Sequence, residues 1–325
     1  MPKKSYFLPI LSSLIVGLII IPVYINVKTN GRSMLLLERF VENGGIVEIF
    51  LLMIYAFFTT KWMTQNQKKA RKTAWTIFSI VFFSQLFAGL LFCQQCLMTG
   101  KLHLPIPAII FAGPIYRLQI GFMTILFVST LIISGPAWCS QLCYFGALDS
   151  VASSRASTSK VKYNKRLRIT LFFSFIAFVL LLRILRMNNF YATILGLLFG
   201  TIGLFLIVLL SKKLGTMIHC TYYCPIGFIV NLYSIFYPIK VKINNNCDLC
   251  FRCTKECKYY AIRLDKDNNM MKIGFNCTNC GDCLDVCHVN AIKYSFYNKQ
   301  KTQFRNFWIV LTIVLHTVFL AFARI

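Results

Sequence analysis

The sequence predicts a polytopic α-helical membrane protein into which a small α+β domain, rich in cysteine, is inserted near the C-terminus. Three observations predict this fold class. The 325 residues are 57% hydrophobic with a mean hydropathy of +0.63, which is typical of a chain with many membrane spans. The apolar residues gather in runs of about 20, the length of a helix that crosses a bilayer. Eight of the 14 cysteines form two regular groups before the last run.

We expect about seven membrane spans. The apolar runs that predict them are residues 7–26, 45–60, 73–92, 118–136, 169–187, 191–211 and 306–323. Six of these spans are expected to form a helical bundle over residues 1–243. The α+β domain takes residues 244–297, and the seventh span lies in the C-terminal segment 298–325.

The segment 97–117, between the third and fourth runs, is apolar but contains Pro105, Pro107 and Pro114. Proline lacks the backbone N–H and clashes with the preceding turn, so we expect no regular helix through this segment. A re-entrant segment that forms one wall of a binding site and a loop on the membrane surface both remain open.

The chain is strongly basic, with 35 Lys and Arg residues against 10 Asp and Glu residues. In a soluble protein this excess would indicate nucleic-acid binding, but here the basic residues lie mainly in the loops between apolar runs. Basic loops of a membrane protein stay on the cytoplasmic side. We therefore expect a multi-pass protein of the bacterial inner (cytoplasmic) membrane, with its N-terminus and its cysteine-rich domain in the cytoplasm and with no nucleic-acid partner.

The cysteine-rich domain contains the pattern C-x-x-C-x-x-C-x-x-x-C twice, with a period of 30 residues. This is the spacing of bacterial two-cluster ferredoxins, in which the fourth cysteine of each run binds the cluster of the other run. We therefore expect a ferredoxin-like domain with two [4Fe–4S] clusters. The first cluster takes Cys247, Cys250, Cys253 and Cys287, and the second takes Cys277, Cys280, Cys283 and Cys257.

A pair of zinc sites is the alternative interpretation of these cysteines. Zinc is usually held by two separated C-x-x-C pairs or by mixed cysteine and histidine sets, whereas each run here has three cysteines at every third position. The pattern therefore favours iron–sulfur clusters. One departure is that Lys258 and His288 stand where ferredoxins usually have a proline after the fourth cysteine, which alters the loop but removes no ligand.

A second repeat lies at the ends of two membrane spans. Cys139 and Cys143 are separated by three residues, as are Cys220 and Cys224, and the offset between the two pairs is 81 residues. Cysteines at positions i and i+4 share one face of a helix, so the pairs present either four thiolates to one metal centre or two dithiols. Packing by buried cysteines is the alternative. The matched placement favours a further redox or metal site, without indicating which centre it holds.

The combination of paired C-x-x-x-C motifs after membrane spans with a two-cluster ferredoxin domain resembles the membrane polyferredoxins over residues 118–295. This family includes the NapH- and MauN-type quinol dehydrogenase subunits and the ferredoxin parts of NosR and CcoG. The resemblance implies electron transfer between the quinol pool and a partner ferredoxin, cytochrome or reductase subunit, through clusters at the cytoplasmic face. Cys224-Pro225 matches the family's motif, whereas Cys143-Tyr144 lacks its proline.

No motif for transforming a substrate accompanies these cysteines, since the chain has neither a Walker loop nor a dinucleotide fingerprint. We therefore expect an electron-transfer subunit of a quinol dehydrogenase rather than a complete enzyme. The alternative is a maturation or assembly factor that reduces a metal or a thiol of a client oxidase or reductase. A membrane scaffold or sensor, whose clusters only report redox state, is a third class.

Three further residues are candidates for function. Cys93 and Cys96 close the third apolar run on the external side, where a disulfide is permitted. They would serve either a thiol relay with an external partner or a structural disulfide. Glu48 lies in the second run, and a carboxylate within the membrane is a functional candidate. It would accept a proton as quinol is oxidised, or it would reach water beside Arg39 or Arg117.

Overall fold

The computed structural model describes residues 6–31, 33, 35–93, 96, 106–157, 163–265, 269–297 and 299–322. The first part of the segment 97–117, up to Pro105, lies outside these residues. The chain divides into two compact units: residues 1–103 with 301–325 form unit 1, and residues 104–300 form unit 2. The boundaries expected at 243/244 and 297/298 stay a prediction.

Seven helices in the described residues are long and apolar enough to cross a membrane, which confirms the predicted number of spans. They are Phe7–Thr29, Gly44–Gln65, Gln67–Leu91, Met123–Leu142, Lys165–Ile184, Asn189–Leu214 and Thr302–Phe322. These helices expose large apolar side chains; Leu18 is 74% exposed and Phe205 is 66% exposed. Such faces are favourable against lipid and unfavourable in water. The chain is therefore a multi-pass membrane protein.

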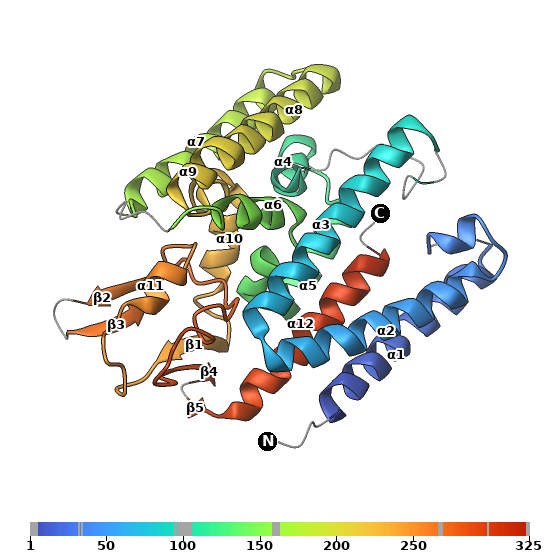
Figure 1. The fold of residues 1–325 in the computed structure, drawn as a ribbon. Coiled ribbons are helices and arrows are strands. Elements are labelled where there is room, and N and C mark those ends of the chain that lie inside the picture. The colour runs from blue at the N-terminus through green and yellow to red at the C-terminus, as the bar shows by residue number, and fades with distance from the viewer. Residues whose placement is uncertain are drawn as a thin grey trace. The chain divides into compact units, whose positions relative to one another are not determined.

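Unit 1 is a helical bundle. Its elements are α1 (Phe7–Thr29), η1 (Leu37–Arg39), α2 (Gly44–Gln65), α3 (Gln67–Leu91) and α12 (Thr302–Phe322). Figure 1 shows α1 lying along α2, and α12 packs on both. His316 of α12 shares a hydrogen bond with Tyr55 Oη over 3.0 Å, and Arg305 Nε donates to Gln67 Oε1 over 3.1 Å. The C-terminal span therefore belongs to the same bundle as the first three.

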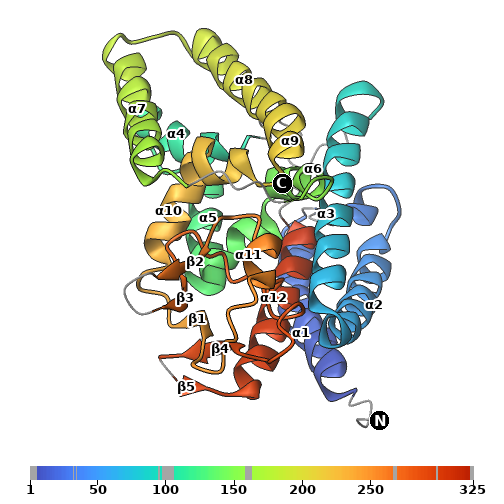
Figure 2. The ribbon, with the colours of Figure 1, turned by 60° about the vertical axis from the view of Figure 1, so that its left-hand side comes forward.

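Unit 2 contains the other three membrane-length helices and the α+β domain (Figure 2). Its helical elements are α4 (Pro107–Arg117), α5 (Phe122–Ser134), η3 (Gly135–Ala137), η4 (Trp138–Leu142), α6 (Tyr144–Ser153), α7 (Lys165–Ile184), α8 (Asn189–Leu206), η5 (Ile207–Ser211), α9 (Lys212–Leu214), η6 (His219–Tyr223), α10 (Pro225–Tyr233) and α11 (Arg252–Glu256). Three of these, η4, η5 and η6, are π turns, which are rare and frequently stand at functional sites.

The expectation that proline excludes a regular helix from the segment 97–117 is wrong for its second part. α4 runs through Pro107 and Pro114. Pro107 stands in the first turn, where the missing backbone N–H would have no partner within the helix. Pro114 removes one hydrogen bond late in a helix of 11 residues, and the helix ends soon after it, at Arg117.

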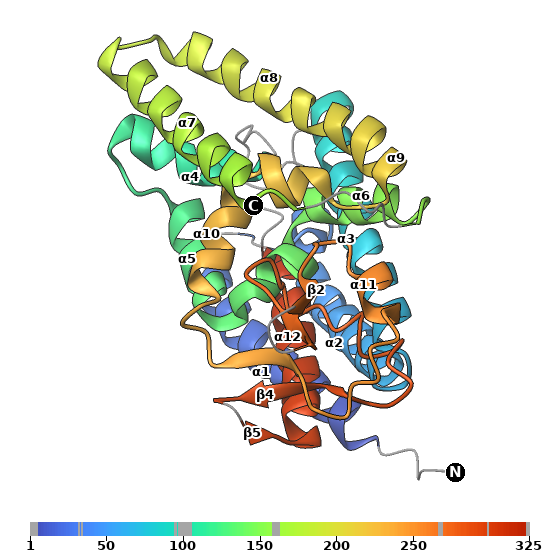
Figure 3. The same ribbon diagram turned by 90° about the vertical axis from the view of Figure 1, so that its left-hand side faces the viewer.

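The α+β domain is present as predicted and contains two small antiparallel sheets. β1 (Ile239–Ile243), β4 (Ile292–Phe296) and β5 (Lys299–Gln300) form one sheet in the order β1-β4-β5, and β2 (Ile262–Asp265) pairs with β3 (Met270–Ile273). Figure 3 shows β1 beside β4. In this pair Val241 lies opposite Tyr294, and both side chains are buried. Because β1 precedes the first cysteine run and β4 follows the second, their pairing joins the two ends of the cysteine-rich segment.

Candidate iron–sulfur centres

The first predicted cluster site surrounds a cavity in the α+β domain. Cys247, Cys250 and Cys253 of the first run line this cavity, and so does Cys287, the fourth cysteine of the second run. Burial, followed by negative charge on the other three cysteines, raises the pKa of Cys253 to about 11. The four sulfurs therefore lie close enough to interact, in the combination that ferredoxin spacing predicts.

The second predicted site brings together the other four cysteines. Burial raises the pKa of Cys283 well above its ordinary value, and charge on Cys280, Cys277 and Cys257 adds to this rise. Cys257 comes from the first run, whereas the other three come from the second. In both sites, therefore, the fourth cysteine of one run meets the three clustered cysteines of the other.

The two cysteine loops share one backbone conformation. Three residues of the first loop have left-handed φ values, and so do the residues 30 positions later. They are Leu249, Phe251 and Tyr260 in the first loop and Asn279, Gly281 and Asn290 in the second. This conformation costs an ordinary side chain about 1–2 kcal/mol, and such strain persists where the surrounding structure imposes it, often at functional sites. Its repetition at matching positions indicates that both loops are shaped for the same kind of ligand.

The fourth cysteine of each run is also held in the same way. The Ala261 N–H donates to Cys257 Sγ, and the Ala291 N–H donates to Cys287 Sγ, each over 3.3 Å. A hydrogen bond to the charged form of a group favours that form. Both loops therefore favour a thiolate at the cysteine that crosses to the other site.

The two residues that replace proline make contacts of their own. His288 Nε2 lies 2.9 Å from Asp248 Oδ2. The main-chain oxygen of Lys258 accepts a hydrogen bond from the Met217 N–H over 3.0 Å, and Lys258 Nζ donates to Ala156 O over 3.2 Å. Lys258 thus ties the first loop to the chain segments that flank α6 and η6.

The donor set of each quartet fits an iron–sulfur cluster, which is held by four cysteine thiolates. Asp248, Cys250 and His288 also each bring one ligand atom to within 4.8 Å of the other two. Buried thiols with raised pKa values need a cation to become thiolates, and the iron of a cluster would supply it.

Both C-x-x-x-C pairs are built on one local motif. In each pair the first cysteine lies in a five-residue π turn and the second caps the α-helix that follows, so the two cysteines do not share one α-helix. Cys143 and Cys224 have similar extended φ/ψ values, −84°/114° and −74°/120°. Cys143 Sγ accepts a hydrogen bond from the Gly146 N–H over 3.4 Å. Burial raises the pKa of Cys224, and the N–H groups of Gly227 and Ile226 oppose this rise.

The two C-x-x-x-C pairs converge within unit 2. η4 packs against α10 and η6 packs against α6, and the Cys220 N–H donates to Asp149 Oδ2 of α6 over 3.0 Å. Burial raises the pKa of Cys220 well above its ordinary value, and charge on Asp149 adds to the rise. So does charge on Cys143, Cys224 and Cys139. All four thiols therefore lie near one another, although they come from segments 81 residues apart.

A buried cation lies beside these thiols. Arg168 is 2% exposed, its Nη1 donates to Asn276 Oδ1 over 2.5 Å, and its positive charge lowers the pKa of Cys224 against the larger effect of burial. With the amide oxygen of Asn231 turned toward it, both terminal nitrogens of Arg168 also donate over 2.9 Å. The sequence did not indicate a role for this residue. Arg168 ends a basic stretch, residues 165–168, and such stretches ordinarily precede a membrane span.

Comparisons with known proteins agree with this geometry. A family model described as a 4Fe-4S dicluster domain matches residues 246–292, and one described as a 4Fe-4S binding domain matches residues 116–162 and 194–244. The ferredoxin-type protein NapH of Haemophilus influenzae is 28% identical over 106 residues, which cover 30% of this chain and 37% of NapH. The electron transport protein YccM of Escherichia coli is 27% identical over 105 residues, which cover 31% of this chain and 29% of YccM. The chain is thus similar to the NapH-like polyferredoxins.

Other relatives extend the match without naming a role. MJ0750 of Methanocaldococcus jannaschii is 27% identical over 135 residues, which cover 41% of this chain and 52% of that protein. No solved structure matches the chain. The chain thus spans about half of MJ0750 and less of NapH and YccM. Electron transport with 4Fe-4S domains is the function that the comparisons support.

Cys93 and Cys96 lie in unit 1. Neither forms a disulfide in the structure, and the Cys96 N–H donates to Cys93 O over 2.9 Å. A side-chain hydrogen bond with Cys93 raises the pKa of Cys96. The two sulfurs are therefore neighbours, while a disulfide between them stays a prediction.

Glu48 lies in the first turns of α2, also in unit 1, and its side chain is buried. Its Oε2 accepts a hydrogen bond from the Leu37 N–H over 2.9 Å. Burial lowers the pKa of Arg39, and the charge of Glu48 opposes this change, so the two groups are neighbours. Glu48 thus lies near Arg39, and its role as a proton acceptor stays a prediction.

Proposed function

We propose that this chain is the quinol-linked iron–sulfur subunit of an electron-transfer system in the bacterial inner membrane. It passes electrons through two [4Fe–4S] clusters to a partner ferredoxin, cytochrome or reductase subunit, with the α+β domain in the cytoplasm. The observation that carries this proposal is that both cysteine quartets belong to the same compact unit as three membrane-length helices. A carrier so placed accepts electrons at the membrane and delivers them to a partner.

The proposed ligands are the two crossed quartets. When bound, each cluster would carry one electron, so together they match the two electrons released, with two protons, as one quinol becomes quinone. The chain holds the ligands with paired strands, repeated loops and backbone N–H groups aimed at Cys257 and Cys287. Hydrogen bonds to the sulfurs also help to set the potential of a cluster.

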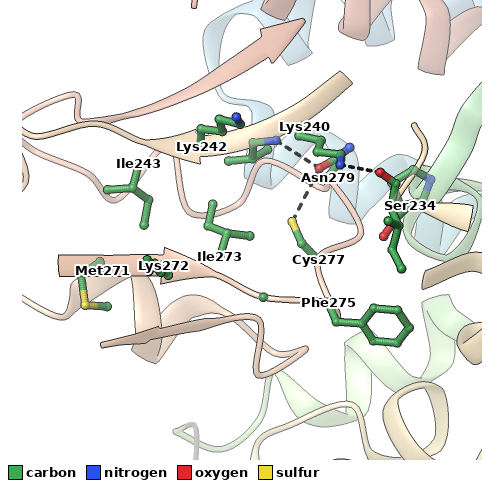
Figure 4. Close-up of a pocket in the computed structure, with 14 residues that line it drawn as sticks. Ser234, Lys240, Lys242, Ile243, Met271, Lys272, Ile273, Phe275, Cys277 and Asn279 are labelled. Atoms are coloured by element: carbon green, nitrogen blue, oxygen red, sulfur yellow. Dashed lines mark hydrogen bonds between the residues drawn. The ribbon is translucent and has the colours of Figure 1, made fainter. Parts of the chain in front are cut away.

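A cavity of about 530 Å³ beside the second quartet supports a quinol site there (Figure 4). Its walls combine Pro136 and Ile235 of the helical part with Cys277 of the second run. The close-up shows Cys277 and Asn279 turned toward one another, and their Sγ and Oδ1 atoms are 3.6 Å apart. Pockets for small molecules have this size and combine apolar walls with a few polar groups. A ring held in the cavity would lie next to a cluster ligand.

Reoxidation by a quinone analogue tests the proposal. The anaerobically purified chain, reduced with dithionite and freed of excess reductant, is mixed with a soluble quinone while the cluster absorbance is followed. We expect rapid reoxidation that saturates with quinone concentration. Cys277→Ser should slow it at least about 10-fold, because one ligand of the second cluster is lost, whereas Cys93→Ser/Cys96→Ser should retain the rate.

The rival function, a maturation factor, has one supporting observation: the neighbouring thiols of Cys93 and Cys96. It predicts reduction of copper or of a client disulfide without quinone, and loss of that activity in Cys93→Ser/Cys96→Ser. That result, together with reoxidation that does not depend on quinone, would contradict our proposal. The cytoplasmic placement is tested separately, and a reporter fused after Gln300 that is active only in the periplasm would refute it.

A further inference from the structure

We infer that the two C-x-x-x-C pairs bind a third [4Fe–4S] cluster, shared between the two segments. Its ligands are Cys139, Cys143, Cys220 and Cys224. The inference rests on the proposed electron-transfer function and extends it by one carrier, located where the membrane-length helices of unit 2 meet the α+β domain.

The convergence of the two pairs is the first argument. Each segment supplies one cysteine from a π turn and one from a helix cap, and the turn of each segment packs against the helix of the other. The Cys220 N–H is bonded to Asp149 of the opposite segment. Such mutual packing leaves the four sulfurs close together from two directions, which is what a cluster with four ligands requires.

The number of ligands is the second argument. The family model for a 4Fe-4S binding domain matches residues 116–162 and 194–244, and each matched segment contains only two cysteines of a C-x-x-x-C pair. Neither segment can complete a cubane alone, whereas the two together supply four thiols. None of the four cysteines forms a disulfide, so all four sulfurs can serve as ligands.

Charge is the third argument. Four thiolates around a [4Fe–4S]²⁺ core carry a net charge of about −2, and burying such a charge is costly unless nearby groups compensate it. Arg168 is buried beside the site and fixed by Asn276. The N-termini of α6 and α10, capped by Cys143 and Cys224, add their positive ends. Among the described residues, Arg168 donates to the uncharged amides of Asn276 and Asn231, and the proposed cluster would supply a negative charge beside it.

The third site is joined directly to the loop of the second predicted cluster. Ser140 Oγ, between Cys139 and Cys143, donates to Thr278 O over 3.2 Å. Thr278 lies between two ligands of the second cluster, Cys277 and Cys280. Arg168 reaches Asn276, the residue before Cys277. These contacts make the second cluster the neighbour of the third, so the three carriers form one series: the C-x-x-x-C site, the second ferredoxin site and the first ferredoxin site.

Iron and acid-labile sulfide analysis of the anaerobically purified full chain tests the inference. Three cubanes predict about 12 iron and 12 sulfide per chain. Cys139→Ser/Cys220→Ser should lower both values to about 8, and the matched variant Cys93→Ser/Cys96→Ser should keep about 12. If the wild type binds about 8 iron and the Cys139/Cys220 variant binds the same amount, the third cluster is refuted while the two-cluster function stands.

Two further results separate the remaining outcomes. The wild type alone decides the matter if the variant fails to fold, because its iron content of about 12 or about 8 distinguishes three clusters from two. About 8 iron together with one zinc or copper that is lost in the Cys139/Cys220 variant would overturn the cluster in favour of a mononuclear centre. A wild type free of iron would overturn both this inference and the function on which it rests.

Discussion

Unit 2 contains two kinds of cysteine site, and they are built in opposite ways. Each proposed ferredoxin site would take three ligands from one tight loop and a single ligand from the other cysteine run. The proposed C-x-x-x-C site would take two ligands from each of two segments that are 81 residues apart. The first kind depends on the shape of a loop, and the second depends on how helices pack. This difference decides which site needs its metal in order to keep its structure.

The backbone of the two sites shows the same contrast. The ferredoxin loops repeat left-handed residues, including Leu249 and Phe251, which have no intrinsic preference for that conformation. Cys143 and Cys224, by comparison, adopt ordinary extended helix-cap conformations. Strain must be offset by bonds formed elsewhere. We therefore expect iron–thiolate bonds to hold the ferredoxin loops and helix packing to hold the C-x-x-x-C site.

Removal of iron gives the largest expected effect and tests this contrast directly. After chelation, amides in residues 247–291 should exchange with solvent at least about 100-fold faster, a loss of about 3 kcal/mol of local stability, because metal binding there is coupled to folding. Amides of α6 and α10 should keep most of their protection. Hydrogen exchange read by mass spectrometry measures both. Equal loss of protection in the two regions would contradict the contrast.

The same contrast explains what the sequence could predict. The 4Fe-4S domain could be predicted because three cysteines of each run stand at every third position, as in Cys247, Cys250 and Cys253. The crossing of the fourth cysteines, which follows from the known spacing of such domains, stays a prediction. The seven spans could be predicted because a membrane span requires a continuous run of about 20 apolar residues, which is visible in the sequence itself.

The sequence predicted the C-x-x-x-C site only in part. The spacing indicated a redox or metal site, but it left open whether the thiols form one quartet or two pairs. That choice depends on η4 packing against α10 and η6 against α6, which no local pattern encodes. Arg168 was missed for the same reason, since its burial arises from contacts with Asn231 and Asn276. Helix α4 was missed because the positions of its prolines, rather than their number, permit a helix.

Substitution of Arg168 should have the next largest effect, confined to the C-x-x-x-C site and the loop beside it. Arg168→Gln should destabilise unit 2 by about 3 kcal/mol, because a buried anionic centre would lose its cation. It should also make the potential of the third cluster more negative, since the reduced cluster carries the larger negative charge. Chemical unfolding and a redox titration followed by electron paramagnetic resonance measure the two effects.

Two variants control this experiment. Arg168→Lys keeps the charge but not the planar set of donors, so it should restore most of the potential and only part of the stability. Arg166→Gln removes an exposed charge from the same helix and should change neither quantity by a measurable amount. An equal shift of potential in Arg166→Gln would show that long-range charge, rather than the buried contact, sets the value.

A matched pair of glycines sharpens the comparison at a smaller scale. A Cβ atom on Gly227 would lie 2.5 Å from the Cys220 carbonyl oxygen, whereas one on Gly274, in the ferredoxin part, would meet Ala261 O at an ordinary 3.4 Å. Gly227→Ala should therefore cost about 1–3 kcal/mol through overpacking and lower the iron content toward that of the Cys139/Cys220 variant. Gly274→Ala should leave the iron content unchanged. If only Gly274→Ala lost iron, the ferredoxin part, rather than the C-x-x-x-C site, would be the one that depends on close packing.

Pro225→Ala should have the smallest effect, and it tests whether the two C-x-x-x-C segments are equivalent. Pro225 occupies the first helical position after Cys224, where proline is favoured because its fixed φ suits the helix and its missing N–H has no partner. At the matching position the first segment has Tyr144, yet Cys143 reaches nearly the same conformation as Cys224. The proline therefore stabilises mainly by restricting the unfolded chain. Its replacement should cost about 0.4–1 kcal/mol without loss of iron or change of potential. A loss of about 4 iron per chain would instead mean that the second segment needs its proline to hold the cluster, and that the two segments share a shape but differ in what maintains it.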